Sequence, residues 1–230
     1  MTSNRIAPHL AGLIVMLAAT TGVHAAPVLW VDWTGGTPGA NGSAQGVLTV
    51  DGETVDVTYT GQIQFLQTGA PGETNYFIPS APYVSATVDD APGTSDIIAL
   101  STATSHTLTF SKAVKDLLFA VVSLNGNGYR FDSDFEILSM GQGYWGNGTL
   151  TKDTSTPGEY LLNGSGEPHG VVEFTANVTS ITWTSLTNEN WNGFTIGVRG
   201  LAAVPEPSSL VMAGVAAAAV AGATIRRRSK

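Results

Sequence analysis

The sequence predicts an all-β domain, an antiparallel β-sandwich or jelly roll, and two observations carry that prediction. Between residues 26 and 203, Thr, Val, Gly, Ser and Asn are plentiful while Lys, Glu and Leu are few, which favours strands over helices. Short runs of β-branched and aromatic residues also alternate with turn clusters, and no helical period is sustained. Short strands at this spacing are typical of sandwiches and jelly rolls.

The strongest local signal is a hairpin. Val47–Val50 and Thr54–Tyr59, both rich in Val and Thr, lie on either side of Asp51-Gly52. Asp-Gly is a preferred pair for the type I′ turn, in which both central residues need positive φ. We therefore expect two paired strands joined by a tight turn.

Further strands are expected wherever β-branched and apolar residues recur between clusters of Gly, Pro, Asn and Asp. They are Tyr83–Val88, Ile97–Leu100, Thr107–Phe110, Leu117–Leu124, Tyr129–Leu138, Val171–Phe174, Ile181–Leu186 and Phe194–Arg199.

The first 25 residues have the layout of a secretory signal peptide. Arg5 supplies a positive charge, Leu10–Ala19 is apolar, and Val23-His24-Ala25 provides small residues before a cleavage point. We expect cleavage after Ala25, so that the exported domain spans residues 26–203.

Residues 204–230 have the layout of a membrane-inserted tail. Val204 is followed by Pro205-Glu206-Pro207, and an uncharged run from Ser208 to Ile225 then precedes the basic residues Arg226, Arg227 and Arg228. About 18 helical residues at about 1.5 Å each just cross a hydrocarbon core of about 30 Å. The cations are expected to stay cytoplasmic.

This three-part tail resembles the PEP-CTERM sorting signal of Gram-negative bacteria. The resemblance implies an intermediate anchored in the inner membrane and processing by an exosortase-type enzyme near Pro207. A permanent single-span anchor is the alternative.

The charge and cysteine content exclude several functions. Residues 26–203 contain 17 acidic and five basic side chains, so the formal net charge of the exported domain is −12. A domain this acidic does not bind nucleic acid or anionic lipid through charge. Cysteine is absent, which excludes disulfides, thiol catalysis and cysteine-ligated metals.

One acidic stretch is a candidate calcium site. If residues 129–138 form one strand, Asp132, Asp134 and Glu136 share a face, since side chains alternate along a strand. Three neighbouring carboxylates suit Ca²⁺, which takes oxygen ligands. The alternative is a solvated face whose charges discourage edge-to-edge pairing.

Two aromatic segments are candidates for sugar contact. Tyr144 and Trp145 lie in a glycine-rich loop next to Asn147, and Trp191 lies between two asparagines. Exposed rings beside amide groups can stack on a sugar ring and bond its hydroxyls. The alternative is that these rings only cap the open end of the sandwich.

Catalytic motifs are not evident. His106 and His169 have no His or Cys partner at ligand spacing, although His169 lies close enough to Glu167 in sequence to pair with it. A glycosidase needs two carboxylates on either side of a groove, and the sequence nominates no pair beyond chance examples such as Glu136 with Glu173.

Segments within the domain also resemble exported PEP-CTERM proteins of no assigned activity. They are Ser95–Leu100, Gly141–Gly146 and Glu189–Thr195. The resemblance implies a surface or matrix protein and supplies no catalytic residues. We therefore expect a non-enzymatic module of the cell surface or exopolysaccharide (biofilm) matrix that binds polysaccharide, with or without calcium. The alternatives are a secreted carbohydrate-active hydrolase and a structural protein that self-associates.

Overall fold

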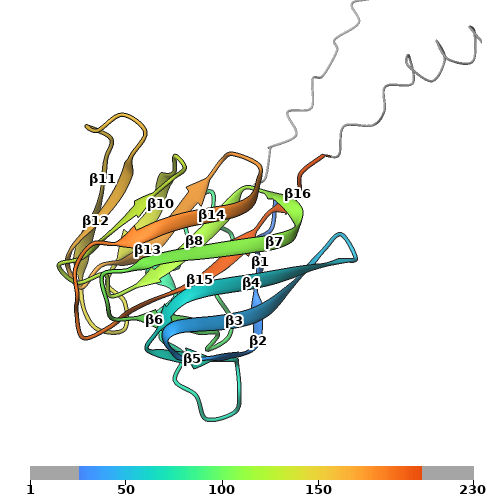
Figure 1. The fold of residues 1–230 in the computed structure, drawn as a ribbon, viewed down its shortest axis with the longest axis horizontal. Coiled ribbons are helices and arrows are strands. Elements are labelled where there is room, and N and C mark those ends of the chain that lie inside the picture. Colours follow the sequence, from blue (N-terminus) through green and yellow to red (C-terminus); the bar gives the residue numbers. More distant parts are fainter. Residues whose placement is uncertain (1–25, 204–230) are drawn as a thin grey trace, which may run out of the picture.

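The computed structural model describes residues 26–203, which form two antiparallel β-sheets packed face to face (Figure 1). The predicted all-β sandwich is therefore confirmed. Within these residues the helical structure is the 3₁₀ turn η1 (Ala81–Tyr83), and no helix there is long and apolar enough to cross a bilayer. The predicted signal peptide and the predicted membrane-spanning tail lie outside the described residues.

The first sheet has seven strands in the order β10-β13-β8-β15-β6-β5, with β1 paired to β15. Its strands are β1 (Leu29–Trp30), β5 (Phe65–Gln67), β6 (Ile97–Leu100), β8 (Leu117–Val122), β10 (Glu136–Gly141), β13 (His169–Phe174) and β15 (Asn192–Val198).

The second sheet has nine strands in the order β11-β12-β9-β14-β7-β4-β3-β2, with β16 paired to β7. Its strands are β2 (Asp32–Thr37), β3 (Gly39–Val50), β4 (Glu53–Ile63), β7 (Ser105–Lys115), β9 (Gly128–Phe131), β11 (Gly148–Asp153), β12 (Tyr160–Gly166), β14 (Val178–Ser185) and β16 (Gly200–Leu201). From β7 onward the chain passes repeatedly between the two sheets.

The predicted hairpin is β3–β4. Val50 pairs with Glu53, and the turn residues Asp51 and Gly52 have φ of 53° and 79°, as a type I′ turn requires. Both strands extend well beyond the prediction.

Two predicted strands are wrong. Tyr83–Val88 is not a strand, because Tyr83 ends the turn η1, which contains Pro82, and the chain then continues without regular structure. The predicted strand Tyr129–Leu138 is divided between the sheets, since β9 ends at Phe131 and β10 begins at Glu136. Phe131 and Phe135 are both buried in the core between the sheets, and these two anchors bend the chain from one sheet to the other.

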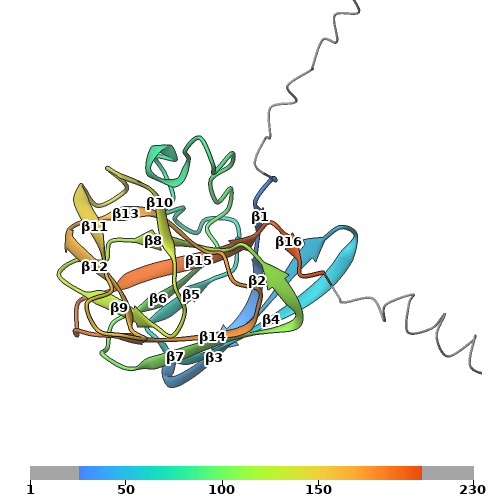
Figure 2. The ribbon, with the colours of Figure 1, turned by 90° about the horizontal axis from the view of Figure 1, so that it is seen from above.

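The seven-stranded sheet is buried on both faces. In β8, Leu117, Phe119 and Val121 pack between the sheets, while Leu118, Ala120 and Val122 pack on the outer face. Residues 68–96, which connect β5 to β6, cover that outer face (Figure 2). This cover explains why six consecutive apolar residues form a strand in an antiparallel sheet.

The two ends of the described chain lie together. Arg199 follows β15 and donates from its guanidinium to the carbonyl of Ala26 at 2.7 Å, and β16 pairs with β7 next to them. The opposite end of β15 is about 20 Å away, because its seven residues span six intervals of about 3.4 Å. The loops at that far end form the site described next.

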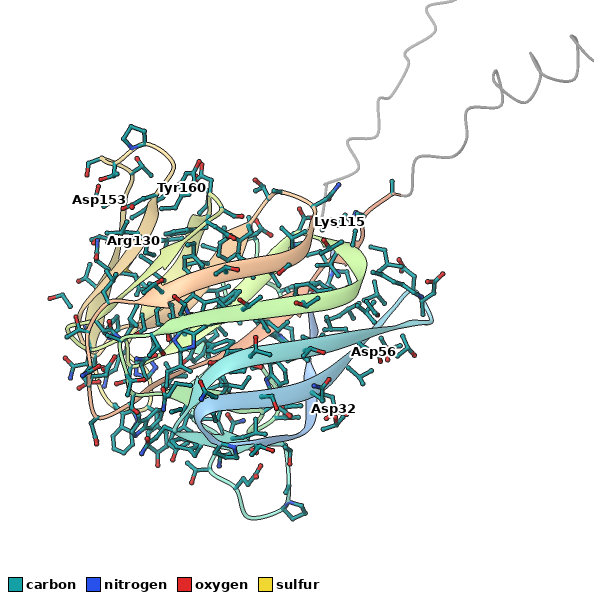
Figure 3. The ribbon with its side chains drawn as sticks, viewed as in Figure 1. Asp32, Asp56, Lys115, Arg130, Asp153 and Tyr160 are labelled. Atoms are coloured by element: carbon teal, nitrogen blue, oxygen red, sulfur yellow. The ribbon has the colours of Figure 1, made fainter. Side chains whose placement is uncertain are left out.

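The charged side chains lie mainly at the surface. Asp32, Asp56, Lys115, Arg130 and Asp153 are all exposed (Figure 3). The domain therefore has a solvated, acidic exterior around an apolar interior.

Candidate functional site

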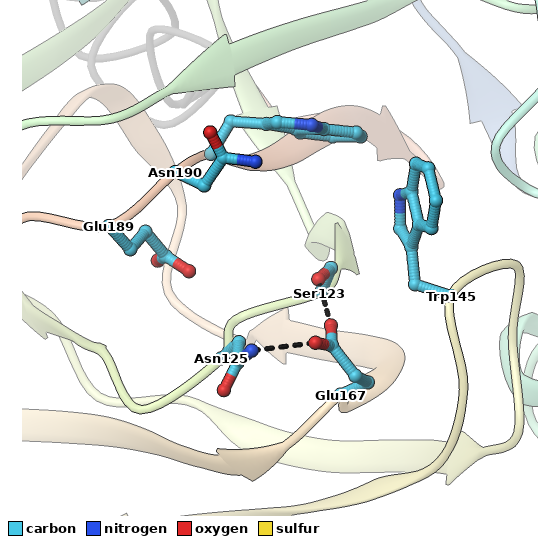
Figure 4. A pocket seen from close by; sticks show the side chains of 7 residues that line it. Ser123, Asn125, Trp145, Glu167, Glu189 and Asn190 are labelled. Carbon is cyan, nitrogen blue, oxygen red and sulfur yellow. Dashed lines mark hydrogen bonds between the residues drawn. The ribbon is translucent and has the colours of Figure 1, made fainter.

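A pocket of about 310 Å³, which Figure 4 shows from close by, lies at the end of the sandwich away from the chain termini. It is lined by Ser123, Asn125, Trp145, Glu167, Glu189, Asn190 and Trp191. These residues come from four loops, which follow β8, β10, β12 and β14. The pocket combines two indole rings with two carboxylates and polar side chains.

Trp145 is presented by a tight turn that only glycine permits. The N–H of Gly143 donates to the carbonyl of Gly146 at 2.8 Å, and Gly146 has φ of 151°. A Cβ on Gly143 would lie 2.2 Å from the ring of buried His169. The glycine-rich sequence thus lets the loop pack tightly at its base while Trp145, half exposed at 50%, projects from its tip.

The pocket tryptophans belong to an aromatic cluster of five rings, Phe65, Tyr76, Tyr144, Trp145 and Trp191. Tyr76 lies at its centre, with ring centroids 4.9 Å from Trp191, 5.0 Å from Tyr144 and 6.2 Å from Trp145. Trp145 and Trp191 are 6.0 Å apart with their planes at 78°. The cluster caps this end of the sandwich and also leaves indole surface open to the pocket.

Glu167 is held by side chains of the loop after β8. The Ser123 hydroxyl donates a hydrogen bond to one carboxylate oxygen, and Asn125 Nδ2 donates one to the other at 2.6 Å (Figure 4). The N–H of Glu167 donates to the carbonyl of Asn147 at 3.0 Å, which ties together the two loops on either side of the pocket.

Glu189 is held by two buried amides. Asn127 Nδ2 donates to Glu189 Oε1 at 2.8 Å, and Asn192 Nδ2 donates to the same oxygen. Tyr129 in turn donates to Asn192 Oδ1. Burial raises the pKa of Glu189; these amide hydrogen bonds lower it and the charge of Glu167 raises it further, and the net result is a raised pKa.

Asn127 also fixes the backbone beneath the pocket. Its side chain is buried, and its Oδ1 accepts from the N–H groups of Gly128, Leu186 and Thr187 at 2.7, 3.1 and 2.8 Å. One asparagine therefore joins the loop after β8 to the loop after β14. The pocket has a rigid polar floor below its aromatic walls.

Of the residues predicted to contact glycan, Trp145 and Trp191 line this pocket. Tyr144 belongs to the aromatic cluster without lining the pocket, and Asn147 contributes its backbone carbonyl instead of its side chain. Sequence patterns do not indicate the other five lining residues, Ser123, Asn125, Glu167, Glu189 and Asn190. They are polar residues near turn glycines or next to Trp191, and only the fold brings their loops together.

The predicted acidic face is not formed. Lys152 Nζ lies 2.7 Å from Asp134 and 2.9 Å from Glu136, whereas Asp132 accepts from the N–H of Thr182 at 3.2 Å. The bend between β9 and β10 separates Asp132 from the other two carboxylates. Within residues 26–203, no group of three or more His, Asp or Glu side chains is placed to hold a metal ion.

His106 and His169 are both buried, and each shares a hydrogen bond with a tyrosine. His106 Nδ1 lies 2.6 Å from Tyr59 Oη, and His169 Nδ1 lies 2.8 Å from Tyr83 Oη. Burial lowers the pKa of each to about 4. His169, which the sequence places close to Glu167, pairs with Tyr83 instead, because its imidazole is buried beneath the segment that covers the seven-stranded sheet.

Glu136 and Glu173, the carboxylate pair named as a chance example for a glycosidase, each form an ion pair with a basic residue. Glu136 and Glu173 are opposite each other in the β10–β13 register, but Glu136 pairs with Lys152 and Glu173 with Arg199 at 2.7 Å. Neither lines the pocket.

Taken together, the described residues define a two-sheet β-sandwich with a polar and aromatic pocket at one end. Residues 203–228 match the family described as PEP-CTERM protein-sorting motif, which begins at the last described residue. The chain therefore carries a PEP-CTERM sorting motif at residues 203–228, and the motif implies an exported protein that is processed by an exosortase. No curated protein and no solved structure matches the chain.

Proposed function

We propose that the exported domain is a non-enzymatic glycan-binding module of the cell surface or exopolysaccharide matrix, and that its binding site is the pocket beside Trp145 and Trp191. The strongest support is that the indole rings of Trp145 and Trp191, from separate loops, line the same pocket as amide and carboxylate groups. Indole faces stack on the apolar face of a sugar ring while polar groups bond its hydroxyls.

The position of the pocket also supports the proposal. The sorting tail follows β16, at the end of the sandwich where Arg199 bonds Ala26. We propose that the tail spans the inner membrane until an exosortase-type enzyme cuts near Pro207. The pocket, at the far end of β8 and β15, then faces away from the membrane and toward polysaccharide.

Retention of the full chain, purified in detergent, on the exopolysaccharide of the producing cells tests the proposal. Trp145→Ala and Trp191→Ala should each release the protein. Met140→Ala is the control, since Met140 is an apolar side chain that is 43% exposed but does not line the pocket. Equal retention of all variants would contradict the proposal.

The same experiment is run with calcium and then with a chelator. Because Lys152 lies between Asp134 and Glu136, we expect the chelator to leave retention unchanged. Loss of retention in the chelator would instead favour a calcium-dependent module.

One observation favours the alternative, a secreted carbohydrate-active hydrolase. Glu167 and Glu189 line the same pocket, and a carboxyl group with a raised pKa is suited to act as a general acid. Hydrolysis predicts that reducing ends appear when the protein is incubated with polysaccharide, and that Glu189→Gln abolishes their release. Our proposal predicts that none appear.

A further inference from the structure

The pocket has an unbalanced negative charge. Glu167 and Glu189 both line it, and none of its lining residues is Lys, Arg or His. The donors that hold the two carboxylates are the neutral side chains of Ser123, Asn125, Asn127 and Asn192.

The basic side chains of the described residues are engaged elsewhere. Four of the five pair with carboxylates outside the pocket, as Lys112–Glu53, Arg130–Glu159, Lys152–Asp134 and Arg199–Glu173. The fifth, Lys115, lies next to Gly200, at the end of the sandwich opposite the pocket. No basic side chain of residues 26–203 therefore balances the two carboxylates of the pocket.

We propose that the pocket binds a sugar residue bearing a free amino group, a hexosamine in its ammonium form. This inference rests on the proposed glycan-binding function and specifies its ligand. An ammonium is attracted to the face of an indole, and it donates strong charge-assisted hydrogen bonds to carboxylates. The pocket offers both kinds of partner, in Trp145 and Trp191 and in Glu167 and Glu189.

The electrostatics of the site agree with a cationic ligand. Burial and the charge of Glu167 both raise the pKa of Glu189. Ionisation of Glu189 is therefore disfavoured while Glu167 is ionised. An ammonium bound beside these carboxylates relieves that repulsion. The net charge of −12 on residues 26–203 also attracts amino sugars and repels uronic acids and sulfated sugars.

The size of the pocket suits one sugar residue of a chain. A volume of about 310 Å³ is at the lower end of the range of roughly 300 to 1,000 Å³ that is typical of small-molecule pockets. A lysine side chain shares the ammonium but lacks the ring that would stack on an indole. We therefore assign the ligand to polysaccharide and use a lysine peptide as the competing ligand in the test.

Isothermal titration calorimetry of the full chain in detergent, with three β-1,4-linked tetrasaccharides, tests this inference. The three carry free amines (glucosamine), acetylated amines (N-acetylglucosamine) or hydroxyls (glucose) on the same backbone. We expect the glucosamine tetramer to bind at least about ten-fold more tightly than the other two. A tetralysine peptide should bind more weakly than the glucosamine tetramer.

Isosteric variants separate pocket recognition from the general charge of the domain. Glu189→Gln keeps an oxygen for the Asn127 and Asn192 amides, and Glu167→Gln keeps one for Asn125. Each should weaken binding of the glucosamine tetramer about ten-fold more than it weakens binding of the glucose tetramer. Glu53→Gln removes the same charge from the surface pair with Lys112, outside the pocket, and should change neither.

The outcomes distinguish this inference from the proposed function. Equal affinity for all three tetrasaccharides, with a loss in Trp145→Ala, would overturn the amine preference and leave glycan binding in place. No binding of any tetrasaccharide would contradict both. If Glu53→Gln weakened the glucosamine tetramer as much as Glu167→Gln, or tetralysine bound as tightly as that tetramer, the amino-sugar site would be rejected.

Discussion

Trp145 and Trp191 meet at the pocket with ring centroids 6.0 Å apart and planes inclined at 78°. Trp145 belongs to the loop after β10, and Trp191 precedes β15. Tyr76, from the connection that covers the outer face of the seven-stranded sheet, contacts both rings. Three remote segments thus fix one aromatic wall, and the site depends on the whole fold rather than on one loop.

The substitution Asn127→Ala should destabilise the domain more than the same substitution at an exposed asparagine. Asn127 Oδ1 accepts from three backbone N–H groups, which would lose their protein acceptor. We expect a loss of at least about 2 kcal/mol in the free energy of unfolding. Asn125→Ala, whose exposed side chain bonds only Glu167, is the control and should cost less than about 1 kcal/mol. Urea unfolding measures both, and similar costs would argue against a structural role for Asn127.

Arg199 is expected to be the most important charged residue for stability. Its side chain is only 7% exposed, pairs with Glu173, and donates to the carbonyls of Ala26 and Thr87. Arg199→Met leaves Glu173, whose side chain is 16% exposed, without its partner, so the free energy of unfolding should fall by about 3 kcal/mol. Lys112→Met removes the exposed pair with Glu53 and should cost at most about 1 kcal/mol. Chemical denaturation that finds equal costs would refute this ranking.

Stability should fall as the pH is lowered below about 6.5. In the folded state the pKa of His106 and of His169 is about 4, below the ordinary histidine value of 6.5, so the unfolded chain binds protons first. Between pH 7 and 5.5 each histidine should remove about 1 kcal/mol from the free energy of unfolding. Asp96 and Glu189 have raised pKa values and act in the opposite direction at lower pH.

Urea unfolding at several pH values measures this slope. His169→Gln should lower stability at pH 7 and should also reduce the slope by about half, a change that simple loss of packing does not produce. An unchanged slope in this variant would contradict burial of a neutral imidazole.

The hairpin was predictable because its signal is local. Asp51-Gly52 sets the turn, and the turn sets the register of the flanking residues. The glycine-rich stretch containing Gly35, Gly36 and Gly42 gave no strand signal, yet it forms parts of β2 and β3. A side chain on Gly36 or Gly42 would meet backbone atoms within 3 Å, so these glycines permit close strand packing.

The two wrong strands show where pattern alone fails. The spacing of Phe131 and Phe135 fits the alternation of a single strand. It fits equally well a segment that crosses from one sheet to the other, which is what these two buried rings anchor. Tyr83 and Val88 are apolar because they cover the outer face of another sheet rather than because they belong to a strand.

The candidate site was predictable only in part. Glycines around Tyr144-Trp145 indicated presented rings, and Trp145 is indeed half exposed. The carboxylates of Glu167 and Glu189 could not be assigned to the site, because their proximity depends on loops after β12 and β14 that meet only in the folded sandwich.

The sorting motif predicts a shortened mature protein. If an exosortase cuts near Pro207, the intact mass of the exported protein should lack Arg226, Arg227 and Arg228. Replacing Pro205, Glu206 and Pro207 with Ala should trap the chain in the inner membrane. Recovery of exported protein that retains the basic residues would show that the tail remains as an anchor.

The most direct test of the central claim is a ¹⁵N NMR titration of the exported protein with its polysaccharide, following the indole N–H signals. The chain has five tryptophans, and Trp33 and Trp183 are buried in the core between the sheets. We predict that the signals of Trp145 and Trp191 shift while those of Trp33 and Trp183 do not. Binding that leaves Trp145 and Trp191 unshifted would contradict the assignment of this pocket.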